Sequence, residues 1–252
     1  MKKLSPLDLL ASFMMLVAVV ALWWLASHEH WVSKVFLPTP ESTLAALADG
    51  LRNGNLTVFT LSTVTRMAIG WVLASLFGAG LGALVASSAW ARAWLQPTLE
   101  FIRPLPASAV MPLAIAIFGL SSRMVLFVVA FGSMWPVLLA TIHGFAVHER
   151  LREVAQSLEL SRAAIAFKIG LPHAMPDILA GMRLAMTVAL IVTVVGEMIA
   201  SQPGLGESIL LAARSFHASE LFAGVILLGA IGIISNALLA LIEQRLLNWQ
   251  QP

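Results

Sequence analysis

The densest group of charged residues lies between Arg150 and Asp177, in a chain that is otherwise strongly apolar. Hydrophobic residues make up 59% of the chain and charged residues 11%, against roughly a quarter charged in soluble domains. The group stands between two long hydrophobic segments, so we expect it to form a water-facing loop. Its charges are Arg150, Arg152, Glu153, Glu159, Arg162 and Lys168. Such a loop is either a docking surface for a soluble partner or a solvated connection.

Two short helices are predicted within this loop. The apolar residues of its first half fall on one helix face, at Leu151, Val154, Ala155 and Leu158. A second helical pattern starts at Ser161, a suitable N-cap, and places Ile165 and Ile169 four residues apart. Pro172 and Pro176 are expected to stop it. Both helices would lie across the end of a helix bundle with their polar faces free.

Charges inside the hydrophobic segments are candidates for a transport pathway or for pairing between helices, because a charge in hydrocarbon faces protein or water. Glu100 and Arg103 share a helix face, and we expect Glu100 to pair with Arg103 or with Arg183. Both arginines are expected to reach the membrane interface. Arg66, near the start of its segment, and Glu197, near the end of its own, lie toward the same side of the membrane. We favour an ion pair joining two helices, and the alternative is contact between Arg66 and an anionic solute.

Several other kinds of chemistry find no support in the sequence. There is no cysteine, and the six histidines are scattered without an i,i+4 pair beside a carboxylate, so we predict no metal site. No glycine-rich loop of the Gly-x4-Gly-Lys-Ser/Thr type is present, so we expect no ATP site and no cofactor. An ion-coupled secondary transporter would need acidic or histidine relays, or an internal repeat, and neither is visible. A membrane enzyme would need clustered reactive groups near one interface.

The elements that position these residues are membrane-spanning helices, because apolar runs of about 20 residues recur along the chain. We predict an all-α polytopic membrane protein with about six spans. They cover roughly Leu9–Ala26, Leu56–Ser87, Leu99–Leu120, Met124–His143, Ile178–Ala200 and Leu221–Ile242. The first run is long and has no small-residue cleavage pattern before His28, which favours a retained helix over a signal peptide. An amphipathic piece is expected from Glu41 to Leu51.

Six spans put both termini on one side of the membrane. With the N-terminus in the cytoplasm, ten of the 15 Lys and Arg residues lie inside and five outside, as the positive-inside rule requires. The charged loop is then cytoplasmic. The expected organisation is a first helix with an outer linker over residues 1–55, a transport domain over residues 56–245 with its loop at 148–176, and a tail at 246–252.

Prolines and glycines mark two spans. Pro104, Pro106 and Pro112 interrupt the third, which predicts either simple kinks or a broken helix lining a cavity. Gly78 and Gly82 in the second are spaced for close helix packing.

The loop also resembles a known pattern. Glu153-Val154-Ala155, three residues to Glu159, and nine more to Ile169-Gly170-Leu171-Pro172 resemble the EAA loop of ABC-importer permeases, E-A-A-x3-G-x9-I-x-L-P. Val154 stands where the family has alanine, and Glu159 where it has glycine. Weaker likenesses to the nitrate/sulfonate/taurine branch are Leu37-Pro38-Thr39-Pro40, Arg66-x3-Gly70, Arg103-Pro104-Leu105-Pro106, Pro112-Leu113 with Phe118-Gly119, Gly196-Glu197-Met198 with Gly204-Leu205-Gly206, and Trp249.

The resemblance implies a type I permease fold in a bacterial inner membrane, and no covalent chemistry in this chain. It implies two permease copies, two cytoplasmic ATPase subunits that bind the loop, and a periplasmic or lipid-anchored binding protein that delivers a small anionic solute such as a sulfonate, taurine or nitrate. The coupling residues would be Glu153, Val154, Ala155, Glu159, Ser161, Arg162, Ile169, Leu171 and Pro172. Candidates for the pathway or for helix pairing are Arg66, Glu100, Arg103, Pro104, Pro106 and Glu197.

Glu159 is the notable departure from the family pattern. Glycine there would allow a positive φ between the two loop helices, whereas glutamate in that conformation costs on the order of 1 kcal/mol. The first helix therefore either continues past Glu159 or turns at Leu160-Ser161. We expect Glu159→Gly to leave transport intact, and a large loss of coupling to ATP hydrolysis would contradict this.

Overall fold

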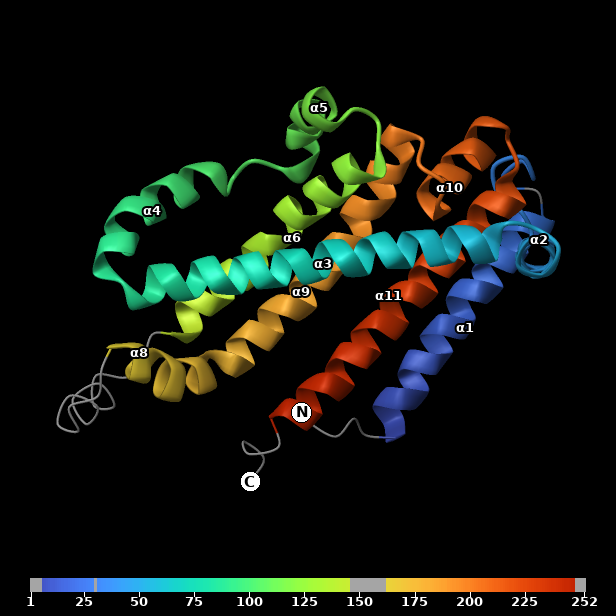
Figure 1. Ribbon diagram of the computed structural model, residues 1–252. Coiled ribbons are helices and arrows are strands. Elements are labelled where there is room, and N and C mark those ends of the chain that lie inside the picture. The colour runs from blue at the N-terminus through green and yellow to red at the C-terminus, as the bar shows by residue number, and fades with distance from the viewer. Residues whose placement is uncertain (1–5, 30, 146–161, 248–252) are drawn as a thin grey trace. The chain divides into compact units, whose positions relative to one another are not determined.

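The computed structural model describes residues 6–29, 31–145 and 162–247, and these residues are mostly helical (Figure 1). Within these described ranges, five helices are long and apolar enough to cross a membrane. They are α1 (Pro6–His28), α3 (Leu56–Ser87), α6 (Ser122–Gly144), α9 (Leu171–Ala200) and α11 (Ala218–Leu246). A sixth crossing is possible if a bent helix pair counts as one span. The prediction of an all-α multi-pass membrane protein is confirmed.

The third span, expected over Leu99–Leu120 with either kinks or a break at its prolines, is two helices. α4 (Ala89–Ile102) and α5 (Ala107–Phe118) meet at an angle of 96°. The break contains Pro104 and Pro106, which lack the backbone N–H that a helix needs and disfavour helical geometry in the residue before them. Pro106 serves as the N-cap of α5, with extended backbone. Pro112 lies inside α5 and does not end it.

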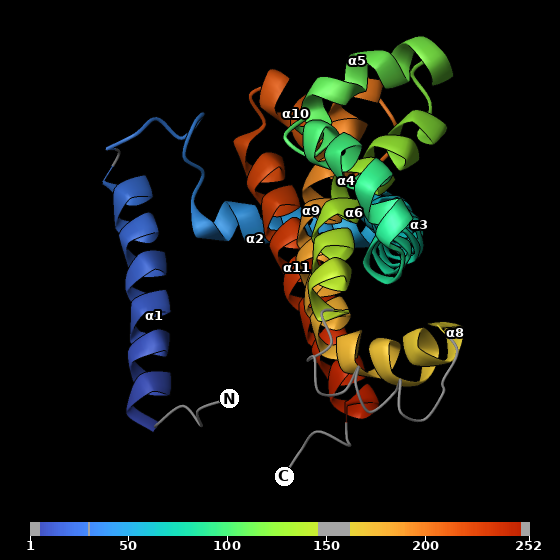
Figure 2. The same cartoon turned by 90° about the vertical axis from the view of Figure 1, so that its left-hand side faces the viewer.

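The fifth span also differs from its expected bounds, because its helix begins at Leu171 rather than near Ile178. Pro172 occupies the first turn of α9, where no intrahelical N–H is needed, and Pro176 is tolerated inside the helix. Just before α9 lie α8 (Arg162–Ile165) and the π-helical turn η1 (Ala166–Gly170). The two prolines therefore do not separate the loop helix from the span. Figure 2 shows this segment turning across the end of α6 and α9.

The chain divides into two compact units. The first comprises Met1–Thr60 and Ser208–Gly229. In it, Trp23 on α1 donates its indole N–H to the Pro38 carbonyl at 2.9 Å, and its ring stacks on Phe222. The expected amphipathic piece is α2 (Pro40–Arg52), whose N-cap Thr39 accepts from the Ser42 N–H.

In this unit, Glu41 in the first turn of α2 is a charged residue that contacts α1. It accepts the indole N–H of Trp24 at 2.8 Å. The pKa of Glu41 is lowered, chiefly by a hydrogen bond from its own backbone N–H and to a smaller extent by the bond from Trp24. The contact joins α1 to α2 at an exposed position.

The second unit comprises Leu61–Glu207 and Ala230–Pro252, and its core is the group α3, α6 and α9. α6 and α9 form the most extensive helix–helix interface and lie side by side in Figures 1 and 2. Glycines allow the close approach, since a Cβ on any of them would overlap or press on a neighbouring helix. On α3 they are Gly70, Gly78 and Gly82, which face α6, and on α9 they are Gly181 and Gly196, which also face α6.

Candidate functional site

A buried carboxylate gathers three donors near the C-terminal end of α9. The Glu197 side chain is fully buried, and Arg66 on α3 donates from Nη1 to its Oε1 at 2.7 Å. The Thr63 hydroxyl, also on α3, donates to Oε2 at 2.9 Å. The Gly206 backbone N–H donates to the same oxygen at 3.0 Å. Both carboxylate oxygens are therefore engaged, as a buried charge requires.

The same group fixes the segment Gln202–Gly206. Arg66 Nη1 also donates to the Pro203 carbonyl at 2.8 Å, and the Leu205 N–H donates to Thr63 Oγ1 at 2.9 Å. A Cβ on Gly204 would overlap the Glu197 carboxylate. Only glycine therefore allows the segment to lie this close to the acid.

The turn into this segment is set by the end of α9. Ser201 caps the helix in the left-handed conformation with φ 47°, and the Gln202 N–H donates to the Glu197 carbonyl at 3.1 Å. The Gln202 side chain accepts from the Ser122 hydroxyl, in the first turn of α6, at 2.8 Å. We name this arrangement the Glu197 cluster: Thr63, Arg66, Glu197 and the segment Gln202–Gly206.

The Arg66–Glu197 ion pair predicted from the sequence is present. The sequence reasoning missed the rest of the cluster, and its only available signal was the spacing of Thr63 and Arg66, which lie three residues apart on one helix face. It also missed the helix α10 (Leu205–Arg214), which begins at the cluster.

The pairing predicted for Glu100 is wrong. Glu100 accepts from Gln96 one turn earlier at 2.8 Å, and Arg183 on α9 instead forms an ion pair with Glu243 on α11. Arg103 lies at the C-cap of α4, next to the helix break. The error arises because sequence spacing identifies partners within one helix but not the neighbouring helix that supplies Glu243.

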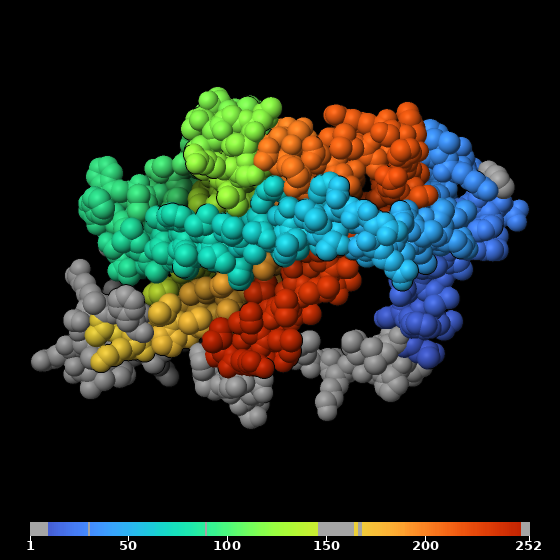
Figure 3. All heavy atoms as spheres, turned by 45° about the vertical axis from the view of Figure 1, so that its right-hand side comes forward, coloured from blue at the N-terminus to red at the C-terminus, as the bar shows by residue number. Residues whose placement is uncertain are grey.

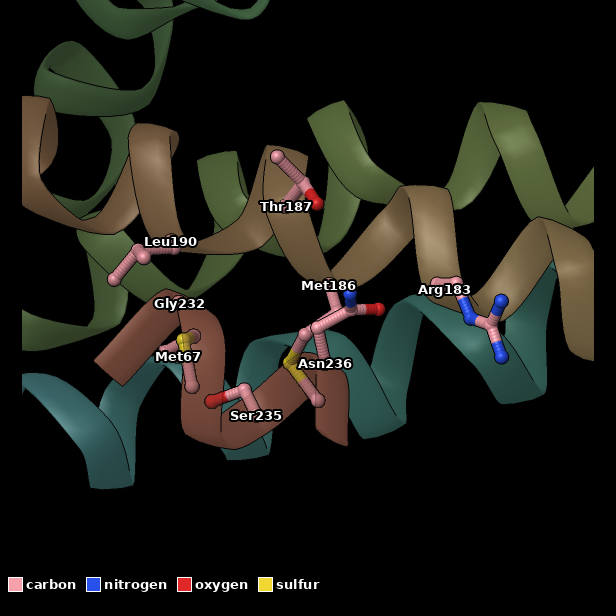
Figure 4. Close-up of a pocket in the computed structure, with 8 residues that line it drawn as sticks. All are labelled: Met67, Arg183, Met186, Thr187, Leu190, Gly232, Ser235 and Asn236. Atoms are coloured by element: carbon pink, nitrogen blue, oxygen red, sulfur yellow. The ribbon is translucent and has the colours of Figure 1, made fainter. Parts of the chain in front are cut away.

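A cleft lies between α3, α9 and α11, where Figure 3 shows α3 (cyan) beside the red C-terminal half of α11. Its empty volume, including the open mouth, is about 290 Å³. Its lining is Met67, Arg183, Met186, Thr187, Leu190, Gly232, Ser235 and Asn236. The exposed lining is almost wholly apolar, and Figure 4 shows the Arg183 guanidinium at one end of the cleft, apart from the other polar groups. The cleft itself therefore offers little to hold a charged solute.

The charged loop lies partly outside the described residues. Glu153, Val154, Ala155, Glu159 and Ser161 belong to that undescribed stretch. Arg162 begins α8, Ile169 lies in η1, and Leu171 and Pro172 open α9. Gly170 is buried, and a Cβ there would press on the Phe145 ring at 3.0 Å. The described part of the loop is thus packed against the end of α6 and joined directly to α9.

Comparison with known proteins identifies the family. A family model described as "binding-protein-dependent transport system inner membrane component" matches residues 74–248. The chain belongs to this family. It is 31% identical over 233 residues to a Bacillus subtilis permease named for aliphatic sulfonate transport, covering 92% of this chain and 84% of the relative. It is 28% identical to the taurine transport permease of Escherichia coli K12 (93% and 87%) and 29% identical to the nitrate import permease of Leptolyngbya laminosa (75% and 68%).

The chain is therefore an ABC-importer permease subunit, not an ion-coupled secondary transporter. ATP hydrolysis belongs to a separate subunit, and the permease works with ATPase and solute-binding partners in general. The Glu197 cluster and the charged loop are at opposite ends of α9 in this permease.

Proposed function

We propose that two copies of this permease form the translocation path of an importer for a small anionic solute, and that the loop at 148–176 couples the path to two ATPase subunits. The transport domain would cover residues 56–245, preceded by an extra helix and linker at 1–55 and followed by the tail at 246–252. The N- and C-termini and the loop would face the cytoplasm of a bacterial cell.

The position of the loop carries the coupling proposal. It joins α6 to α9, the two helices with the most extensive mutual interface. At the loop end, a Cβ on Gly144 would lie 2.9–3.0 Å from Ala174 and 3.0 Å from Asp177. A displacement of the loop would therefore move α6 and α9 together, because these two helices are closely packed against each other. The spacing from Glu153 to Pro172 supports the same role.

The solute class is supported by the relatives. Three are named for aliphatic sulfonates, taurine and nitrate, all of which present an anionic oxyanion group. The solute bound by the partner binding protein would identify it directly. A molecule without a sulfonate, nitrate or similar oxyanion group in that protein would contradict the proposed class.

Glu153→Arg combined with Ala155→Asp tests the docking role. Reversing the charge and placing a carboxylate on the apolar stripe should abolish co-purification of the ATPase and stop uptake, while the permease itself remains in the membrane. The matched control is Glu220→Gln, which changes an exposed acid that lies 3.6 Å from His217 and should leave both readouts at wild-type levels. Full ATPase recovery with normal uptake in the double variant would refute the docking assignment.

Because the chain contains no cysteine, an introduced cysteine would be the single reactive thiol of the permease, and its labelling can report the orientation of the chain in the membrane. A cysteine at the exposed Lys168 should react with a membrane-impermeant maleimide only after the cells are opened, because the loop is proposed to face the cytoplasm. A cysteine at the exposed Ser201, at the other end of α9, should react in intact spheroplasts. The reverse pattern would place the loop outside and exclude ATPase docking.

A further inference from the structure

We propose that the Glu197 cluster is a latch, in which Thr63, Arg66 and Glu197 are positioning residues that seat the segment Gln202–Gly206 on the end of the helix core opposite the coupling loop. Engagement of the binding protein on that side would reach the ATPase subunits through this latch. The inference rests on the proposed function, since it assigns a second element to the same coupling route.

The first support is the density of bonds that hold a short segment. Between Gln202 and Gly206, three backbone groups are bonded to side chains of the cluster: the Pro203 carbonyl and the N–H groups of Leu205 and Gly206. Leu205 itself is fully buried. The segment can move away from the cluster only if several hydrogen bonds break together. This favours two discrete positions of the segment over gradual movement.

The second support is the rigidity of what lies between the latch and the loop. Glycines bring α6 and α9 into close contact along their shared length: Gly144 at the loop end, Gly181 against Pro136 and Ala140, and Gly196 against Val125 at the latch end. α3 carries the other half of the latch and is tied to α9 by the Trp71 indole N–H, which donates to the Met182 carbonyl at 2.9 Å. A close-packed interior of this kind transmits displacement instead of absorbing it.

The third support is that Arg66 Nη1 and the Thr63 hydroxyl both form hydrogen bonds with other groups of the protein. Arg66 Nη1 serves both Glu197 and Pro203, and the guanidinium side chain is only 14% exposed. Thr63 Oγ1 donates to Glu197 and accepts from Leu205, so one hydroxyl links α3, α9 and the segment. The arrangement holds backbone in place, and the Arg66 charge is paired with the Glu197 carboxylate.

Thr63 offers the sharpest test, because its hydroxyl can be removed without disturbing the ion pair. Thr63→Val is nearly isosteric and loses both hydrogen bonds, whereas Thr63→Ser keeps them. In the full complex in proteoliposomes, we measure ATP hydrolysis with and without solute-loaded binding protein. Thr63→Val should lower the stimulated-to-basal ratio about fivefold with unchanged basal rate and unchanged KM for ATP, and Thr63→Ser should retain the wild-type ratio.

Other results overturn the latch. A stimulated-to-basal ratio in Thr63→Val within about twofold of the wild-type ratio would overturn it. An equal loss of this ratio in Thr63→Ser, or an equal fall of the basal and stimulated rates, would also overturn it, since each indicates an effect of packing alone. If Thr63→Val does not assemble, Ser122→Ala, which frees Gln202 from α6, must lower the ratio in the same direction, and a normal ratio there refutes the latch. A wild-type complex without any stimulation would instead refute the proposed function.

Discussion

Glu197 is accommodated inside the helix bundle because three donors converge on its two carboxylate oxygens. Only the ionic part of this arrangement could be predicted from the sequence, because opposite charges at matching depths in two spans suggest a pair. The Thr63 hydroxyl and the Gly206 N–H could not be predicted. Apart from the spacing of Thr63 and Arg66 on one helix face, uncharged donors carry no sequence signal that they face a particular acid, and the chain path from Ser201 to Gly206 is set by tertiary contacts.

Arg66→Met should strongly destabilise the permease, because it leaves the buried Glu197 carboxylate with neutral donors alone. We expect a loss of about 3–5 kcal/mol in the free energy of unfolding, measured by denaturant titration in detergent. The double variant Arg66→Met/Glu197→Met should recover much of this loss, since it removes both charges. Glu220→Gln is the control, and its exposed pair with His217 should contribute less than about 1 kcal/mol. If Arg66→Met lowered the free energy of unfolding no more than this control, the ion pair would not contribute to the stability of the fold.

At the scale of elements, the sequence predicted five of the spanning helices because their apolar runs are long and uninterrupted. At the prolines it left kinks and a break as alternatives, and it expected Pro172 and Pro176 to stop a helix that they do not stop. Pro104 and Pro106 separate two helices, whereas Pro112, Pro172 and Pro176 are tolerated within or at the start of one. Pro172 is harmless because the first turn of a helix needs no intrahelical N–H at that position, whereas Pro104 and Pro106 follow the last turn of α4. The outcome at a proline therefore depends on where the helix begins and ends, which sequence spacing did not reveal.

Two glycines of α3 provide a matched test of the close packing between elements. A Cβ at Gly78 would lie 2.7 Å from the Met134 carbonyl oxygen of α6, and backbone cannot yield as a side-chain end can, whereas a Cβ at Gly80 would meet nothing within 4 Å. Gly78→Ala should lower the free energy of unfolding by about 1–3 kcal/mol. Gly80→Ala should be neutral or stabilising by about 0.5–1 kcal/mol, because alanine favours the helix. Equal effects of the two substitutions would contradict close contact between α3 and α6.

At the scale of the molecule, burial is uneven among the spans. In the most apolar stretch of α6, 44% of residues are buried within the chain, against 11% in α11. The charges Arg66 and Arg183 are each paired within the chain, and the cleft beside α11 is lined mainly by apolar surface. In the proposed assembly, a second copy would supply the surfaces that complete a polar path for the anion.

Two differently tagged copies of the permease, expressed together with the ATPase, should therefore be recovered in one complex when either tag is captured. The expected native mass corresponds to two permeases and two ATPases, since each coupling loop engages one ATPase. Copies expressed separately and mixed only after solubilisation serve as the control, and they should not exchange, because an interface that lines the path forms during assembly. A mass corresponding to one permease per complex would show that the path is built from a single chain, and the surfaces of α11 would then have to be covered by lipid.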